Sequence, residues 1–294
     1  MNHKQSIKTE ILDHCPLCGH RQLTEEMYVD DFETNTGAYT LVKCDGCRTC
    51  FTNPQPTDAE ISQLYKERST SDFPEHNTLT LWLRSLSIQL KLRQQLKGSE
   101  LSILDYGCGD GFLALQLAQN SCCRQITAVD FHSTPPALIE NRNNIRYFPY
   151  HDFSDANESY DIIFCRHVLE HLENPAKWIM TMKDRLKSQG RIIAEVPNYS
   201  SIWKTVFGKY YSALYVPRHL FHFTPQTFQQ LFHNFDYAHM RRKHSPFLGR
   251  SLGSKLNAPI QNTGLTGLIL FPLQIFVDII TGKSSTLEIT AGIK

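Results

Sequence analysis

The sequence lacks the features of several large classes of protein. Its net charge is only +1 at pH 7, from 30 Lys/Arg and 29 Asp/Glu, so composition gives no case for a nucleic-acid partner. It has no internal repeat and no low-complexity segment, which argues against solenoids and disordered linkers. The N-terminal residues MNHKQSIKTE have no apolar core of a signal peptide, so we expect a cytoplasmic protein.

Long hydrophobic runs are missing as well. One apolar stretch, 264–280, is shorter than the roughly 20 residues that span a bilayer, and a proline and two polar residues interrupt it. Two interpretations stay open for 249–280: a helical lid over a substrate pocket, or a peripheral contact of 264–280 with a membrane or lipid-linked substrate. After Pro197 there are ten Lys/Arg against three Asp/Glu, which suits a phosphate-bearing ligand, an anionic membrane or a solvated basic face.

Cysteine, by contrast, is concentrated in one place: five of the nine cysteines fall within 15–50. Two C-x-x-C pairs, 15–18 and 44–47, are separated by 25 residues, each at a glycine-containing turn. Such turns let two thiolates face one ion, and two pairs complete a tetrahedral Zn²⁺ shell. A redox or empty site is the alternative, and Cys50 is a fifth candidate whose spacing fits less well. The predicted ligands of the structural zinc are Cys15, Cys18, Cys44 and Cys47.

A glycine-rich turn follows an apolar strand in SILDYGCGDG, residues 102–111. Glycines at alternate positions let the backbone turn sharply and approach a ligand where a Cβ would collide. About 20 residues further on, the strand 125–129 ends in Asp130, where an acidic side chain can accept hydrogen bonds from two ribose hydroxyls. Further strands at 160–165 and 190–197 alternate with helical patterns, which is typical of βαβ units and a mostly parallel sheet.

These motifs together resemble one family. DYGCGDG at 105–111, AVD at 128–130 and YDIIFCRHVLEHLENP at 160–175 resemble class I S-adenosylmethionine-dependent methyltransferases in order and spacing, above all the ubiquinone-pathway O-methyltransferase branch. The resemblance implies an α/β, doubly wound, seven-stranded and mostly parallel sheet. Its last strand, 285–293, would run antiparallel after a strand near 237–243. S-adenosylmethionine is the implied cofactor, with S-adenosylhomocysteine as product.

By the same resemblance, the glycine-rich turn would hold the methionine part of the cofactor. Asp130 would hold the ribose, and the aromatic residue after it would flank the adenine, with 152–153 at the adenine edge. The implied cofactor-binding residues are Asp105, Gly107, Cys108, Gly109, Asp130, Phe131, Asp152, Phe153 and Arg166.

The N-terminal part carries a second resemblance. LVKCDGCRTCFTNPQP at 41–56 resembles the zinc module fused to sugar- and natural-product-modifying methyltransferases, of which deoxysugar C-methyltransferases are the best known. The sequence as given departs from that group in showing no large additional C-terminal domain, so we do not favour C-methylation. The expected parts are a zinc-ribbon-like module at 1–56, a helical linker or lid at 57–97, and the S-adenosylmethionine-binding domain at 98–294, with lid insertions near 200–225 and 245–284.

Catalytic candidates follow the fifth strand. Methyl transfer from a sulfonium is an in-line displacement, so a hydroxyl acceptor needs positioning and a base, usually histidine. In deoxysugar C-methyltransferases a similar stretch reads Tyr-x-Glu-His, with the histidine proposed as base; His219 falls on that histidine, whereas Val216 and Arg218 replace its helpers. We predict His219, together with His167 at the end of the fourth strand, as catalytic. The predicted substrate contacts are Glu195, Asn198, Arg218 and His222.

HVLEH at 167–171 also matches the H-x-x-E-H form of zinc peptidases, but its place after a buried strand fits the methyltransferase order better. The predicted function is methyl transfer to a small-molecule acceptor (a sugar, nucleotide sugar, lipid-linked or natural-product intermediate), with oxygen favoured over nitrogen or carbon. Two alternatives stay open. An RNA methyltransferase with an N-terminal zinc module would show salt-sensitive RNA binding, and a non-catalytic homologue would bind cofactor without transferring the methyl group.

Overall fold

The computed structural model describes residues 7–32, 36–57, 60–61, 78–153, 158–256 and 263–294; the side chains of 78–84 and 263–268 are outside this description. The chain divides into two compact units. Unit 1 comprises Met1–Ile61, His167–Ile179 and Glu195–Ile289, and unit 2 comprises Ser62–Arg166, Met180–Ala194 and Thr290–Lys294. The predicted boundaries at 56 and 97 stay a prediction, and most of the predicted linker (58–59 and 62–77) lies outside the described residues.

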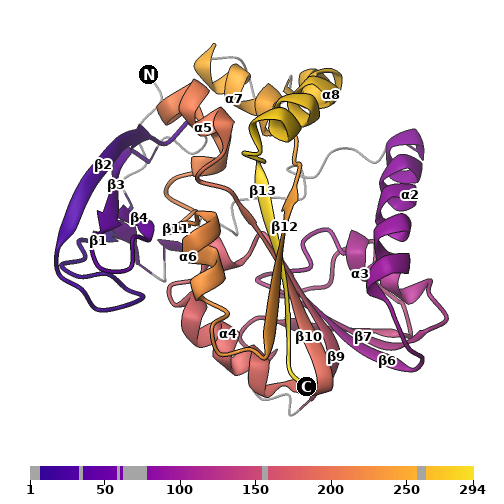
Figure 1. The fold of residues 1–294 in the computed structure, drawn as a ribbon. Coiled ribbons are helices and arrows are strands. Elements are labelled where there is room, and N and C mark those ends of the chain that lie inside the picture. Colours follow the sequence, from indigo (N-terminus) through magenta and orange to yellow (C-terminus); the bar gives the residue numbers. More distant parts are fainter. Residues whose placement is uncertain (1–6, 33–35, 58–59, 62–77, 154–157, 257–262) are drawn as a thin grey trace. The chain divides into compact units, whose positions relative to one another are not determined.

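A seven-stranded sheet has the order β12-β13-β10-β9-β6-β7-β8 (Figure 1). β6 pairs in parallel with β7 and β9, and β7 pairs in parallel with β8. β13 runs antiparallel to β10: Asn198 N, just after β10, donates to Ser285 O, whereas Ile293 N donates to Gly190 O near the start of β10. The predicted doubly wound sheet and its antiparallel last strand are therefore confirmed. The strands are β6 (Leu101–Tyr106), β7 (Cys123–Asp130), β8 (Ile145–Pro149), β9 (Tyr160–Arg166), β10 (Leu186–Pro197), β12 (Tyr237–Lys243) and β13 (Thr286–Gly292).

The core of unit 2 explains why its strands read as apolar runs. Strands of a parallel sheet that are covered on both faces carry few polar residues. Buried residues of β6, β7 and β9, among them Ile103, Ile126 and Ile162, form one cluster with Leu117 of α3 (Phe112–Ala118) and Leu92 of α2 (Thr78–Gln95). This packing fixes the carboxyl ends of β6 and β7, where the predicted cofactor residues lie. α4 (Pro175–Asp184) follows the motif at 160–175 and begins at its proline.

Unit 1 contains an antiparallel sheet of order β11-β4-β3-β2, which combines the cysteine-rich segment with residues far along the chain. Tyr39 and Leu41 of this sheet share a core with Trp203, Phe207 and Tyr211. The strands are β2 (Leu23–Asp30), β3 (Ala38–Cys44), β4 (Cys50–Asn53) and β11 (Phe221–His222), with β1 (Thr9–Glu10) pairing with β5 (Gln55–Pro56). Short helices follow β10: α5 (Ile202–Phe207), the 3₁₀ turns η4 (Gly208–Tyr210) and η5 (Ser212–Leu214), and α6 (Pro225–Gln230).

Two further helices belong to unit 1, α7 (Phe247–Lys255) and α8 (Thr263–Thr281). Both lie at one end of β12 and β13 (Figure 1). Within the part of the chain that is described, no helix is both long and apolar enough to cross a membrane.

Candidate functional site

The turn between β6 and α3 has a backbone that favours glycine. Gly107, Gly109 and Gly111 have φ values of 76°, 56° and 77°, in the left-handed region that residues with a Cβ rarely adopt. A Cβ on Gly111 would lie 2.9 Å from Cγ2 of Ile139. The turn is fixed to the neighbouring strand because the N–H groups of Gly107 and Cys108 both donate to Val129 O. Gly107 and Gly109 are partly exposed and carry no side chain, so a ligand can approach the backbone closely there, whereas Gly111 is buried against Ile139.

Asp105 ends the apolar part of β6 and is only 2% exposed. Burial raises the pKa of its carboxyl to about 7, with Asp130 and Asp110 adding to the shift and Arg166 opposing it. Among the described residues, Oδ2 of Asp105 has no hydrogen-bond partner. A buried carboxyl oxygen without a partner is costly, so this position suits a cationic ligand group.

Asp130, at the end of β7, is tied to the same turn. Its Oδ2 accepts from Gly109 N at 2.7 Å, and its Oδ1 accepts from Phe131 N at 2.8 Å. Burial raises the pKa of the Asp130 carboxyl, and these two backbone donors oppose the rise. Each carboxylate oxygen has a second lone pair, so the side chain can still accept hydrogen bonds from a diol.

Aromatic rings line the segment after Asp130. The ring of Phe131 stacks on Tyr150 at 4.9 Å, and Tyr150 lies 6.1 Å from Tyr106 of the glycine-rich motif. The sequence analysis did not select Tyr150 as a cofactor-binding residue, although an aromatic residue directly after the strand β8 could have indicated it. Asp152 is exposed, whereas Phe153 is buried 6.0 Å from the ring of Tyr106.

These residues of unit 2 fit S-adenosylmethionine. The glycine turn gives close backbone approach, and the orphaned oxygen of Asp105 suits the cofactor's ammonium group. Asp130 suits the ribose hydroxyls, and the stacked pair after it offers an aromatic surface to the adenine. Cys108 is buried, and burial raises the pKa of its thiol, so it contributes a neutral, small side chain. Arg166 acts on the charge of Asp105, as noted above.

The four predicted zinc ligands come together in unit 1. Their sulfurs all lie within 4.8 Å of one another, with Sγ–Sγ distances of 3.6 Å for Cys15–Cys47 and 3.5 Å for Cys18–Cys44. A tetrahedral zinc with Zn–S bonds of about 2.3 Å separates its sulfurs by about 3.8 Å, whereas a disulfide bond is about 2.05 Å long. The arrangement therefore fits a zinc ion and not a pair of disulfides.

Two similar turns present these thiols. Gly19 N donates to Cys15 O at 2.8 Å, and Arg48 N donates to Cys44 O at 3.0 Å; Gly19 and Arg48 both have left-handed φ values. Cys50 lies outside the group of four. It is buried in β4, and burial raises the pKa of its thiol to about 12. Cys50 is therefore a neutral core residue here.

The predicted catalytic histidines of unit 1 lie beside a buried glutamate that sequence reasoning did not select. His167 follows β9 with a φ of 55°, and its Nδ1 lies 3.4 Å from Oε1 of Glu170. His219 Nε2 lies 3.9 Å from the same oxygen. His171 belongs to a single 3₁₀ turn, η3 (Leu169–His171), so the H-x-x-E-H match is not carried by an α-helix as a peptidase motif requires. These residues form one polar cluster.

His219 and His222 are held as neutral imidazoles. Burial lowers the pKa of His219 well below 6.5 and lowers that of His222 to about 3. His219 Nδ1 lies 2.8 Å from Ala213 O and therefore donates to it, while His222 Nε2 lies 3.0 Å from Oγ1 of Thr52. Thr52 Oγ1 donates to His219 O at 2.7 Å, so β4 fixes the stretch that carries both histidines. A cavity of about 10 Å³ beside them is large enough for about one water molecule.

The remaining predicted substrate residues have partners within unit 1. Glu195 faces Glu288, and the proximity of the two carboxyls adds to the effect of burial in raising the pKa of Glu288. Asn198 Nδ2 donates to Ser284 O at 2.6 Å, and its Oδ1 accepts from Ser200 N at 2.9 Å. Arg218 is buried, with its guanidinium 5.1 Å from the ring of Tyr215. The contacts of Asn198 favour a structural role for this side chain.

Comparisons with known proteins identify methyltransferases as relatives of this chain. The ubiquinone biosynthesis O-methyltransferase of Rickettsia conorii is 26% identical over 179 residues, which cover 59% of this chain and 50% of that protein. The enzyme of the same name from Rickettsia canadensis is 31% identical over 106 residues, 34% of this chain and 44% of that protein. This chain thus spans about half the length, or less, of these relatives.

Among solved structures, the plantazolicin methyltransferase BamL, bound to a desmethyl analogue and S-adenosylhomocysteine, aligns over 80% of this chain and 91% of its own at 18% identity. The TM-score of this alignment is 0.48. A family model described as "Methyltransferase domain" matches residues 76–240. Because this match covers more than half of the chain, the protein belongs to the methyltransferase domain family.

Proposed function

We propose that this protein transfers the methyl group of S-adenosylmethionine to an oxygen atom of a small-molecule acceptor. The observation that carries the proposal is the turn of unit 2, where the orphaned carboxyl oxygen of Asp105, the left-handed glycines and Asp130 meet. Membership of the methyltransferase domain family supports the reaction, and the name of the Rickettsia relatives, O-methyltransferase, supports oxygen as the acceptor atom.

When bound, S-adenosylmethionine supplies an electrophilic methyl group on a positively charged sulfur. Asp105 would hold the cationic amino group, and Asp130 would fix the ribose, so that the reactive end is oriented. The acceptor oxygen must lose its proton as it gains the methyl group. The polar cluster of unit 1 around His219 and His167 is the candidate for acting on this proton.

Calorimetric titration with S-adenosylmethionine and S-adenosylhomocysteine tests the proposal. Asp130→Asn removes the charge from the ribose acceptor, and hydrogen bonds to a charged group contribute about 1.5–3 kcal/mol. We expect binding to weaken about 10- to 100-fold. Asp184→Asn, an exposed position in unit 2, is the control and should leave affinity unchanged. A folded protein that binds neither ligand would contradict the proposal, as would equal affinity in the two variants.

We propose further that the four clustered cysteines bind a structural Zn²⁺. The Sγ–Sγ distances and the absence of a disulfide between these thiols support it. Four protein ligands leave zinc no open position, so its role would be to stabilise the sheet of unit 1. Catalysis would then depend on other residues.

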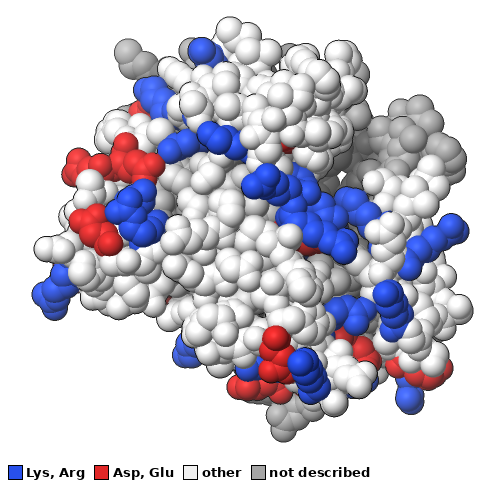
Figure 2. All heavy atoms as spheres, viewed as in Figure 1, with Lys and Arg blue, Asp and Glu red and all other residues white. Residues whose placement is uncertain are grey.

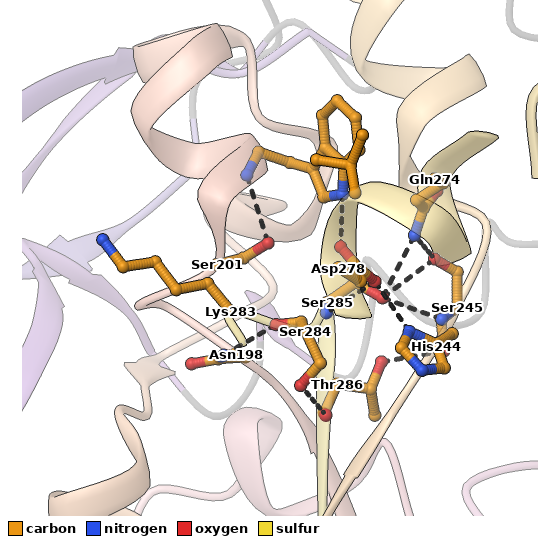
Figure 3. Close-up of polar contacts among 12 residues, drawn as sticks. Asn198, Ser201, His244, Ser245, Gln274, Asp278, Lys283, Ser284, Ser285 and Thr286 are labelled. Carbon is orange, nitrogen blue, oxygen red and sulfur yellow. Dashed lines mark hydrogen bonds and ion pairs between the residues drawn. The ribbon is translucent and has the colours of Figure 1, made fainter. Parts of the chain in front are cut away.

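We also propose that α8 contacts a membrane, because its polar side chains are buried in unit 1 and its apolar side chains are exposed. Gln274 and Asp278 are fully buried. Gln274 Oε1 accepts from Leu248 N at 3.0 Å, and Asp278 Oδ1 accepts from Trp203 Nε1 at 2.7 Å. Asp278 Oδ2 pairs with His244 Nδ1 at 2.9 Å (Figure 3). These bonds fix which face of α8 points into the unit.

The outward face is apolar. Five of its side chains are between 53% and 69% exposed: Ile269, Leu273, Phe276, Ile279 and Ile280. Arg242 lies beside Gly282, just after the end of α8. Two further cations are exposed: Lys283, which follows α8 in the sequence, and Arg250 of α7. In Figure 2 the surface over α8 is uncharged and bordered by Lys and Arg side chains. An apolar helix face with a basic border fits the surface of an anionic bilayer, from which a lipid-linked acceptor could be taken.

Co-sedimentation with vesicles tests this contact. We expect binding to vesicles of 30% phosphatidylglycerol in phosphatidylcholine, and weaker binding to pure phosphatidylcholine. Phe276→Ser combined with Ile280→Ser should reduce binding at least about tenfold, since each side chain loses roughly 1.5 kcal/mol or more of burial. Val206→Ser, at an apolar position of unit 1 that is 53% exposed, is the control. Equal binding of both variants, or self-association through α8 in place of vesicle binding, would overturn the proposal.

A further inference from the structure

Glu170 is a buried carboxylate whose charge is not balanced by hydrogen bonds. It is 1% exposed, and neither carboxylate oxygen has a hydrogen-bond partner among the described residues. His167 Nδ1 and His219 Nε2 lie 3.4 and 3.9 Å from Oε1 of Glu170, and neither contact has hydrogen-bond geometry. Burying an ionised carboxylate without partners costs several kcal/mol, so a cation beside Glu170 would remove a large penalty.

Two histidines approach this carboxylate in fixed orientations. His171 Nδ1 lies 2.9 Å from Arg218 O, and His219 Nδ1 lies 2.8 Å from Ala213 O. In both rings the Nδ1–H therefore donates to a backbone carbonyl, which leaves Nε2 as the atom suited to coordinate a metal. This backbone support is the arrangement that metal-binding histidines commonly have. The two rings lie 4.6 Å apart at an angle of 70°.

We infer that Glu170, His171 and His219 bind a divalent transition-metal ion, distinct from the zinc of the four cysteines. One ligand atom from each residue lies within 4.8 Å of the other two, all within unit 1. The strained φ of 55° at His167 begins this segment, and backbone strain of this kind clusters at functional sites. Leu220 N donates to Glu170 O at 2.7 Å, which holds η3 against the stretch that carries His219.

The donor set selects the kind of metal. Two imidazole nitrogens and one carboxylate suit Zn²⁺, Mn²⁺ or Fe²⁺, whereas Ca²⁺ and Mg²⁺ prefer oxygen ligands. Three protein ligands leave at least one coordination position open, in contrast to the closed shell of four cysteines. The site is therefore suited to bind and polarise an oxygen atom.

This deepens the proposed function and rests on it for its chemical role. A hydroxyl oxygen of the acceptor that occupies the open position loses its proton to water more easily, because the metal lowers its pKa. Methyl transfer to an ionised oxygen forms the oxygen–carbon bond as the carbon–sulfur bond breaks, and the sulfur leaves as a neutral thioether. His219 would then act as a ligand and not as the base.

Metal counting on the full-length protein tests the site. Protein dialysed against Zn²⁺ and then freed of excess metal is analysed by mass spectrometry for zinc per chain. We expect two equivalents for the wild type and one for Glu170→Gln and His219→Asn, whose affinity for the second ion should fall about 100-fold or more. The amide that His219→Asn introduces would keep a donor for Ala213 O. His222→Gln, a buried neighbour outside the group, is the matched control and should retain two.

Cobalt substitution gives an independent measurement. Co²⁺ in the cysteine site produces a thiolate charge-transfer band, whereas a second equivalent at Glu170 should add visible absorption without increasing that band. Circular dichroism identifies any variant that fails to fold. One equivalent in folded wild type, or two in folded Glu170→Gln, would overturn the inference. If the second ion is missing while S-adenosylhomocysteine still binds, the metal site is refuted and the proposed function stands. If two ions are bound but S-adenosylhomocysteine is not, the metal site stands and the proposed function is refuted.

Discussion

The raised pKa of Asp105 predicts that cofactor affinity depends on pH. Burial lifts this pKa from 3.8 to about 7, and at about 1.4 kcal/mol per unit the ionised form costs up to about 4 kcal/mol. A ligand with an ammonium group beside the carboxyl favours the ionised form. If S-adenosylhomocysteine binds only that form, affinity approaches its maximum above about pH 8 and falls about tenfold between pH 8 and pH 6.

The stability of the protein without cofactor should change in the opposite direction. Because the folded protein holds this proton more tightly than the unfolded chain does, the contribution of Asp105 is complete below about pH 4 and is lost as pH rises through 7. Between pH 5 and pH 8 the loss amounts to about 2–3 kcal/mol in the free energy of unfolding. For a chain of this size, that lowers the melting temperature by roughly 5 °C.

Asp105→Asn separates these effects from other titrations. The variant keeps the shape of the side chain but has no proton to lose, so it should bind the ligand weakly at every pH and unfold with a flatter pH dependence. Calorimetry at pH 6, 7 and 8, with thermal unfolding in the same buffers, gives both slopes. The pH dependence that remains in the variant comes from the titration of the ligand and of all other groups of the protein. The difference in pH dependence between wild type and variant is therefore the contribution of Asp105. Identical slopes in wild type and variant would refute the reasoning.

Three further predictions concern the supports of the site. Cys44→Ser should lose the zinc and unfold at lower denaturant concentration, whereas Cys50→Ala should keep one zinc in the cysteine site; equal zinc content by mass spectrometry would contradict this. Thr52→Val removes the donor to His219 O and should cost about 1–3 kcal/mol in the free energy of unfolding, measured by urea denaturation; no loss would show that the bond is unimportant. Gly111→Ala should weaken cofactor binding more than Gly208→Ala, because only the former places a Cβ against Ile139.

Much of unit 2 could be predicted from the sequence, because its signals are local. Apolar runs, the glycines of 105–111 and the acidic end of the next strand each indicate a structure within about ten residues. The ends of β12 and β13 were also predicted closely, at 237–243 and 285–293. The spacing of the two C-x-x-C pairs predicted that their four sulfurs come together, and the four sulfurs do lie within 4.8 Å of one another.

The parts that escaped prediction depend on contacts between distant segments. β11 has only two residues and no periodic pattern, so its pairing with β4 leaves no signal in the sequence. In the sequence, Glu170 could not be told from an ordinary polar residue of a helix. Only the structure shows that it is buried beside His219. The apolar composition of 264–280 left a lid and a membrane contact open as interpretations, because the sequence did not show which face of α8 the bonds of Gln274 and Asp278 turn inward.

The pairing of β4 with β11 has a consequence for how the chain is made. Thr52 and His219 are 167 residues apart, so β4 remains a free sheet edge while the intervening chain is synthesised. At about 5–20 residues per second, that interval lasts on the order of 10–30 s. An unpaired edge is a site of aggregation, so the nascent N-terminal segment should depend on chaperones or slow expression until residue 222 leaves the ribosome.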